Sequence, residues 1–219
     1  HPVTARLSPV PTGAMRPGAD ARPVGKIRPQ PDVPAHHLLN IISPMAISAF
    51  VVKVPSAEPL VGDLRQRFDA TTKLGVPAHI TVLVPFMDPQ HITSAVLDRA
   101  QHALNRVAAF SFSLGRVARF PATAYLVPEP PEPFVAMTKA LVDVFSDFQP
   151  YGGEHQGVVP HLTVAHGNPS EAAAVAAELQ GRLDAFGAVK AGCASVVLIE
   201  NSTGRWEELH VFHLSRAAA

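Results

Sequence analysis

Cysteine is nearly absent from this sequence of 219 residues, which contains a single one, Cys193. Cys193 lies beside an apolar run and is expected to be a small buried side chain. One cysteine cannot form a disulfide bond within the chain, and disulfides mark oxidising compartments. The sequence therefore favours a reducing compartment, and we predict a cytoplasmic location.

An excess of charge is also missing, because 18 Lys and Arg residues balance 18 Asp and Glu residues. Beyond residue 44, acidic side chains slightly outnumber basic ones. A DNA duplex binds to an extended basic surface, so we expect no DNA duplex as a partner. A small anionic ligand needs only a few local groups and stays compatible with this composition.

Long uninterrupted apolar runs are lacking as well. The most apolar stretch of the N-terminal part, residues 38–54, is broken by Asn40, Ser43, Pro44 and Lys53. This pattern excludes a transmembrane helix there, and the start of the chain has no signal-peptide layout. We therefore expect no membrane partner.

Proline, by contrast, is abundant, and nine of the 22 prolines fall in residues 1–44. That segment has almost no periodic apolar pattern, so we interpret it as a flexible tail or a non-native extension. Residues 45–219 are predicted to form a single bilobal domain, with one lobe over about 45–118 and the other over about 119–214. A domain of this size can bury a sizeable core, and we expect a monomer.

One short pattern occurs twice in this domain. Residues 75–82 read GVPAHITV and residues 157–164 read GVVPHLTV, so Gly, Val, His, Thr and Val recur at the same offsets. Each copy is a mostly apolar, β-branched run next to a proline, which predicts a buried strand. Residues two apart on a strand share a face, so each motif presents a histidine beside a threonine, opposite the side chains of the core.

The elements around the two copies follow the same order. Strands are predicted over residues 47–54, 79–82, 110–114, 122–127, 161–164, 195–199 and 206–214. Helices are expected from Pro59, from Asp88-Pro89, from Phe134 and from Asn168-Pro169. Each half thus reads strand, helix, His-Thr strand, helix, strand. The sequence predicts an α+β fold of duplicated βαβαβ halves with pseudo-twofold symmetry and a central cleft that carries both H-x-T motifs.

Two histidines on opposite sides of a substrate are suited to phosphoryl transfer. A histidine titrates near ~6.5, so one ring can remove a proton from the attacking oxygen while the other protonates the leaving oxygen. The neighbouring hydroxyls can hydrogen-bond phosphate oxygens and stabilise charge on phosphorus, so we expect neither a metal nor a cofactor. A 2′,3′-cyclic phosphate fits best, because its strained ring is reactive and the adjacent hydroxyl is the leaving group.

The sequences HITV at residues 79–82 and HLTV at residues 161–164 resemble the paired H-x-T/S-x motifs of the two-histidine (2H) phosphoesterases. That superfamily includes the bacterial 2′-5′ RNA ligase (RNA 2′,3′-cyclic phosphodiesterase) proteins. The resemblance covers residues 45–214 in element order. It implies a bilobal fold with a central cleft and metal-independent hydrolysis of a 2′,3′-cyclic phosphate to a 2′-phosphate. For some members it also implies reversible 2′-5′ joining of RNA ends.

The resemblance assigns roles to four residues and suggests three more. His79 and His161 correspond to the acid/base pair, and which of them is the base stays open. Thr81 and Thr163 correspond to the phosphate ligands. The implied partner is a nucleotide or an RNA end with a cyclic phosphate.

Residues 116–126 resemble the hairpin that lies between the lobes of such proteins, where an aromatic or basic group is often near the base or phosphate. Arg119, Phe120 and Tyr125 are therefore candidate substrate-binding residues. Taken alone, an arginine of this kind is typical of a solvated surface, and the two aromatic residues are typical of a core.

Simpler roles are expected for the other histidines. We interpret His91, His102, His210 and His213 as structural. His155, His161 and His166 lack the close pairing and the carboxylate or thiolate partner of zinc sites, so they do not indicate a metal site.

Two other functions stay open at this point. One is a non-catalytic module that binds a nucleotide or RNA, and the other is a hydrolase of 2′-5′ linked oligonucleotides. The enzyme is favoured because both histidines and both threonines are present, whereas a degenerate binding module would be expected to have lost at least one of them.

Overall fold

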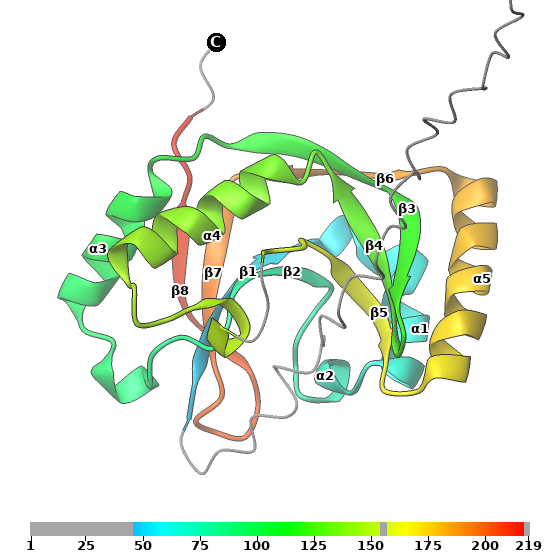
Figure 1. Cartoon of the computed structure of the whole chain (residues 1–219), viewed down its shortest axis with the longest axis horizontal. Helices are drawn as coiled ribbons and strands as arrows, with labels where there is room; N and C mark the ends of the chain where they lie inside the picture. The colour runs from blue at the N-terminus through cyan, green and yellow to red at the C-terminus, as the bar shows by residue number, and fades with distance from the viewer. Residues whose placement is uncertain (1–45, 154–156, 217–219) are drawn as a thin grey trace, which may run out of the picture. The chain divides into compact units, whose positions relative to one another are not determined.

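The structure is a computed structural model that describes residues 46–153 and 157–216 (Figure 1). The predicted tail over residues 1–44 and the loop residue His155 lie outside the described residues. The division into this tail and a single domain over residues 45–219 therefore stays a prediction.

The described part of the chain alternates between strands and helices. The strands are β1 (Ser48–Lys53), β2 (His79–Leu83), β3 (Phe110–Phe120), β4 (Thr123–Glu129), β5 (Leu162–His166), β6 (Val189–Cys193), β7 (Ser195–Glu200) and β8 (Glu207–His213). The α-helices are α1 (Glu58–Phe68), α2 (Ala70–Lys73), α3 (Ser94–Leu104), α4 (Glu132–Val144) and α5 (Pro169–Phe186). Short 3₁₀ helices are η2 (Pro55–Ala57), η3 (Pro89–His91) and η4 (Pro150–Gly153).

The strands form two four-stranded sheets with matching layouts. One sheet has the order β2-β1-β7-β8 and the other has the order β5-β4-β3-β6. All neighbouring strands in both sheets are antiparallel. The two motif strands, β2 and β5, therefore lie at equivalent edges, beside β1 and β4. The predicted α+β class with two related halves is confirmed.

The two sheets do not divide the chain at one point. Strand β3 crosses the predicted lobe boundary near residue 118 and pairs with β4 and β6 in the second sheet. Strands β7 and β8 return to the first sheet, where β7 pairs with β1 (Figure 1). The cause is local: β3 continues to Phe120 and turns back after two residues, so its hairpin with β4 holds it in the second sheet.

The helices predicted from Pro59, Phe134 and Asn168 are present, and the helix start predicted at Asp88 is wrong. Asn168 caps α5 as expected, because its Oδ1 accepts hydrogen bonds from the backbone N–H groups of Ser170 and Glu171. Asp88-Pro89 begins only the short turn η3, and α3 starts later with Thr93 as its N-cap. Strand β6 was not predicted, because it is short, it contains the weak strand formers Ala191 and Gly192, and only Cys193 is buried.

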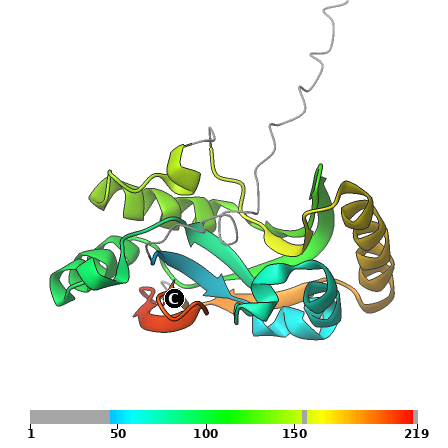
Figure 2. The same ribbon diagram turned by 90° about the horizontal axis from the view of Figure 1, so that it is seen from below.

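Two hydrophobic clusters lie on opposite faces of the sheets. On β1, Phe50 and Val52 belong to the main core, whereas Ala49 and Val51 point to the other face. Helix α5 covers the main-core face of the second sheet, where it contacts β3, β4 and β5 (Figures 1 and 2). The other face carries what we call the second cluster: Ile47, Ala49, Val51, Val76, Val84, Phe120, Tyr125, Val127, Tyr151, Val197, Ile199 and Trp206.

Helices connect the halves as well as covering them. Helix α1 contacts β5, and α4 contacts β2, so each motif strand is packed by a helix from the other half of the sequence.

Among the helices that the structure describes, none combines the length and the apolar character needed to cross a membrane.

Candidate active site

The predicted alternation is present in both motif strands. On β2, Ile80 and Val82 are buried in the main core, and on β5 the same is true of Leu162 and Val164. The remaining side chains of the motifs point to the opposite face, where the histidines are 7% exposed and the threonines half-buried: His79, Thr81, His161 and Thr163. Thus each copy of the repeat presents the same two polar groups beside a buried apolar backing.

Both polar faces lie on the side of the second cluster. Thr81 lies opposite Val51 of β1, and Thr163 lies opposite Tyr125 of β4. Directly opposed residues in an antiparallel pair share a face, and both Val51 and Tyr125 belong to the second cluster. The two motifs therefore face the same apolar cluster from two different sheets.

The two histidine rings are anchored in the same way. His79 Nδ1 is 2.8 Å from the carbonyl oxygen of Pro77, and His161 Nδ1 is 2.7 Å from the carbonyl oxygen of Val159. A carbonyl oxygen only accepts, so Nδ1 carries the hydrogen in each ring. The neutral form of each histidine then has an unprotonated Nε2, which is the nitrogen that can exchange a proton with a ligand.

The motifs also approach each other. Strand β2 contacts β5 although they belong to different sheets. A positive charge on His161 lowers the pKa of His79, so the rings are near enough to interact electrostatically. Residues that are 82 positions apart in the sequence are thus brought together.

Burial holds both rings mainly neutral in the free protein. It lowers the pKa of His79 to about 4, with a further contribution from the charge of Arg65, while the hydrogen bond to Pro77 opposes the shift. Burial also lowers the pKa of His161, against the opposing effect of its bond to Val159. Neither ring is therefore a permanent cation near pH 7.

Aromatic side chains surround His161. The ring of Phe120 meets it edge-on with centroids 5.5 Å apart, and the ring of Tyr125 lies 5.2 Å away. Phe120 and Tyr125 stack on each other at 4.5 Å. Two of the three predicted substrate-binding residues thus lie against the second histidine.

Arg119 lies apart from this group. It is exposed and alternates with Phe120 along β3, so it points to the opposite face of the strand. Arg116 is on the face of Phe120, pairs with Glu129 at 3.1 Å and lowers the pKa of Tyr125 against the larger effect of burial. The cation on the motif side of this hairpin is therefore Arg116 rather than Arg119.

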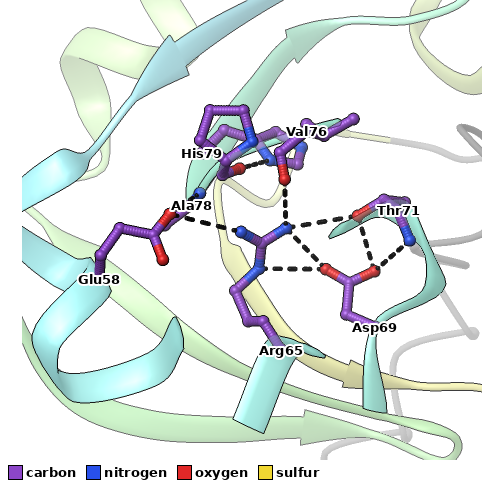
Figure 3. Close-up of polar contacts among 8 residues, drawn as sticks. Glu58, Arg65, Asp69, Thr71, Val76, Ala78 and His79 are labelled. Atoms are coloured by element: carbon purple, nitrogen blue, oxygen red, sulfur yellow. Dashed lines mark hydrogen bonds and ion pairs between the residues drawn. The ribbon is translucent and has the colours of Figure 1, made fainter. Parts of the chain in front are cut away.

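A buried ion-pair network supports the first motif, and the sequence did not reveal it. Arg65 of α1 is 1% exposed and binds Asp69, Thr71 and the carbonyl of Val76, just before His79 (Figure 3). The only sequence signal is the i,i+4 spacing of Arg65 and Asp69, which is equally typical of a surface ion pair.

Other histidines of the described residues have different surroundings. His166, at the end of β5, bonds to Thr123 through Nδ1 at 2.7 Å, and His91, His102 and His213 lie at exposed or half-exposed positions. In the described ranges, no three His, Cys, Asp or Glu side chains are grouped so that they could hold a metal ion.

Comparisons with known proteins agree with this fold. Among solved structures, E. coli LigT in complex with 3′-AMP has a TM-score of 0.51 and 12% sequence identity, over 78% of this chain and 99% of LigT. A crystal structure of a phosphoesterase has a TM-score of 0.50 and 13% identity, over 78% and 99% of the two chains. At these identities the likeness is one of fold.

Sequence comparison identifies the family. No match was found among curated protein sequences. The family model of the 2′-5′ RNA ligase superfamily matches residues 53–205, which is most of the chain and includes both H-x-T motifs. The chain therefore belongs to the 2′-5′ RNA ligase superfamily.

Proposed function

We propose that this protein is a phosphoesterase that hydrolyses the 2′,3′-cyclic phosphate of a nucleotide or RNA end to a 2′-phosphate, without a metal ion. The observation that carries the proposal is the matched pair of His-x-Thr strands, in which both rings keep Nε2 available while Nδ1 is bound to a carbonyl. Membership in the 2′-5′ RNA ligase superfamily supports a reaction at phosphorus.

The proposed reaction uses one histidine as base and the other as acid. The base takes a proton from water through Nε2, and the water oxygen bonds to phosphorus. The bond from phosphorus to O3′ breaks, and O3′ receives the proton of the second ring, which leaves a 3′-hydroxyl and a 2′-phosphate. With a 5′-hydroxyl in place of water, the same steps join RNA ends through a 2′-5′ linkage, so ligation is the corresponding alternative reaction.

The acid must be charged before it can donate, although burial keeps both rings mainly neutral in the free protein. A bound phosphate brings a negative charge close to both rings and raises their pKa values. We propose that one of the two histidines takes up a proton when the substrate binds. The pH profile of kcat/KM should then be bell-shaped, because one ring must be neutral and the other protonated.

The remaining predicted residues complete the proposed site. The hydroxyls of Thr81 and Thr163 would donate hydrogen bonds to the non-bridging phosphate oxygens. The stacked rings of Phe120 and Tyr125 would lie beside the base of the nucleotide. Binding of a nucleotide by this fold is supported by LigT, which was solved with 3′-AMP.

The test is hydrolysis of each 2′,3′-cyclic nucleotide in EDTA, with wild type beside His161→Ala and with the product isomer identified. We expect turnover to the 2′-phosphate in the wild type, unchanged by EDTA, and loss of turnover in the variant. Formation of the 3′-phosphate, or loss of wild-type activity in EDTA, would contradict the proposal.

Two outcomes of this test lead to the alternative functions. Cleavage of 2′-5′ linked oligonucleotides alone would indicate a hydrolase of that linkage. Binding of nucleotides without any turnover would indicate a non-catalytic module. The cytoplasmic location and the monomeric state stay predictions.

A further inference from the structure

We propose that Arg65 is a positioning residue for His79, and that it acts with Asp69 and Glu58 by fixing the backbone that orients the His79 ring. The consequence for catalysis depends on the proposed function, but the contacts and their first test do not. Figure 3 shows the guanidinium of Arg65 enclosed between the start of α2 and the loop that leads into β2.

The guanidinium joins three segments of the chain. Its Nε and Nη2 donate to Asp69 Oδ2 at 3.1 and 2.9 Å. Nη2 also reaches Thr71 Oγ1 at 3.3 Å and the carbonyl oxygen of Val76 at 3.2 Å. A planar fork can hold a carboxylate and a backbone carbonyl at once, which a lysine cannot do in the same geometry.

Asp69 extends this link into α2. Its Oδ1 accepts from the backbone N–H of Thr71 at 3.0 Å and from the Thr71 hydroxyl at 2.7 Å. Asp69 is therefore both the partner of Arg65 and the N-cap of α2. The end of α1 and the start of α2 are fixed by the same carboxylate.

Glu58 holds the last residue before the motif. Its Oε1 accepts from the backbone N–H of Ala78 at 2.6 Å and lies 3.8 Å from Arg65 Nη1. Val76 is bound by Arg65, Ala78 by Glu58, and the carbonyl between them, that of Pro77, accepts from His79. The carbonyl that orients the ring is thus held on both sides by side chains of α1.

The loop is also held from its outer side. The backbone N–H of Trp206 donates to the carbonyl of Leu74 at 2.8 Å, and Arg205 Nη1 donates to the carbonyl of Lys73 at 3.2 Å. The next residue, Gly75, has a φ of 96° and lies against Arg205 and Trp206. An added Cβ would come within 3.2 Å of the Trp206 carbonyl oxygen.

The charges of the network predict the direction in which the pKa of His79 changes when one of them is removed. Arg65 disfavours the protonated form of His79, and Asp69 favours it. The other ionisable groups nearby are Glu58 on α1, Lys53 opposite His79 on β1, and His161. Removal of the cation and removal of the anion must therefore shift the titration of His79 in opposite directions.

The first experiment is NMR titration of the His79 ring in the free, full-length protein. The resonance is assigned by comparison with His79→Gln. We expect the pKa of His79 to be higher than in wild type in Arg65→Met and lower in Asp69→Asn. The matched control is Arg182→Met, because Arg182 binds Asp63 of α1 through two bonds of 2.7 and 2.8 Å but does not shift the pKa of His79.

Shifts of the same sign in the two variants, or no shift in either, would overturn the proposal, since they would show that the charges of Arg65 and Asp69 do not act on the His79 ring. If Arg65→Met does not fold, Asp69→Asn decides the question alone: a pKa at or above the wild-type value would overturn it. This titration requires no turnover, so its result is independent of whether the proposed reaction is correct.

The second experiment separates positioning from charge. Arg65→Lys retains the charge but loses the fork, so we expect kcat on the cyclic phosphate to fall by about tenfold to a hundredfold, with KM changed less than about threefold. The His79 titration should stay close to that of wild type. An unchanged kcat in Arg65→Lys would contradict the positioning role.

Discussion

The two H-x-T motifs share the anchoring of their rings but differ in what surrounds them. In both, Nδ1 donates to the carbonyl two residues earlier, within 0.1 Å of the same distance. Behind His79 lies a buried network of charges around Arg65, whereas His161 lies against Phe120 and Tyr125. The short repeat thus sets the ring orientation, and distant elements set the environment.

This difference matters for the proposed mechanism. A base and an acid must differ in protonation at the moment of reaction, although both are the same imidazole. Identical surroundings would give both rings the same proton affinity in the free protein. The pKa of His79 depends on the charges of Arg65 and Asp69 in addition to burial, whereas that of His161 depends on burial and on its hydrogen bond to Val159, so the two rings are unequal before a substrate binds.

The largest expected effect comes from removing either ring. We expect His79→Ala and His161→Ala each to lower kcat by about 10²–10⁴-fold, since each removes one proton-transfer group. The measurement is steady-state hydrolysis of a 2′,3′-cyclic nucleotide. His102→Ala, at an exposed position of α3, is the control and should retain wild-type activity. Full activity of either ring variant would show that the acid/base pair is assigned wrongly.

A smaller effect is expected from the two hydroxyls. Thr81→Val and Thr163→Val keep the β-branched shape and remove the hydrogen bond to phosphate, so kcat should fall by about 10–10²-fold. Thr81→Ser and Thr163→Ser restore a hydroxyl and should recover much of the loss. If the valine variants turn over normally, the threonines are only strand-forming residues.

A test of the aromatic side of the comparison is Tyr125→Leu. We expect KM for the cyclic nucleotide to rise by about tenfold, because the stacking surface next to His161 is lost. Tyr125→Phe keeps the ring and serves as the control, with KM close to that of wild type. Equal KM values in wild type and Tyr125→Leu would mean that the nucleobase does not stack on Tyr125.

The smallest expected effect concerns stability in acid. The unfolded chain protonates His79 near ~6.5, whereas the folded protein does so only at about 4, so the unfolded state binds more protons as the pH falls between these values. The wild type should therefore lose stability in this window. We expect His79→Gln to reduce the loss between pH 7 and pH 5 by about 1–2 kcal/mol, measured by urea unfolding.

His102→Gln is the control for that measurement, since His102 is exposed. If the stability of His79→Gln falls between pH 7 and pH 5 as steeply as that of wild type, other groups cause the acid sensitivity. Comparison with His161→Gln would then show whether the two rings share the effect equally.

Much of the motif geometry could be predicted, because it depends on neighbouring residues. Alternation along β2 and β5 fixes which side chains share a face, and it correctly separated His79 from Ile80 and His161 from Leu162. The same rule, applied to β3, would have separated Arg119 from Phe120. The family resemblance had suggested both for the site without regard to the face.

The pairing of strands and the burial of Arg65 could not be predicted in this way. The pattern of β3 shows a strand but does not name its partner, so its place in the second sheet depends on the turn that follows Phe120. On α1, Arg65 follows the apolar Leu64, and nothing in the sequence shows that the segment over residues 69–76 contacts it and that it is 1% exposed. Contacts between segments distant in sequence decide both.

The exchange of strands between the halves also bears on how the chain is made. Strands β3 to β6 lie together in residues 110–193, so every strand of the second sheet is synthesised before β7. The first sheet has only β1 and β2 at that stage, and a two-stranded piece is marginally stable. Its central partner, β7, arrives with residues 195–200. The sheet that carries His79 is therefore the last to be completed during translation, although its first strand is the first to be synthesised.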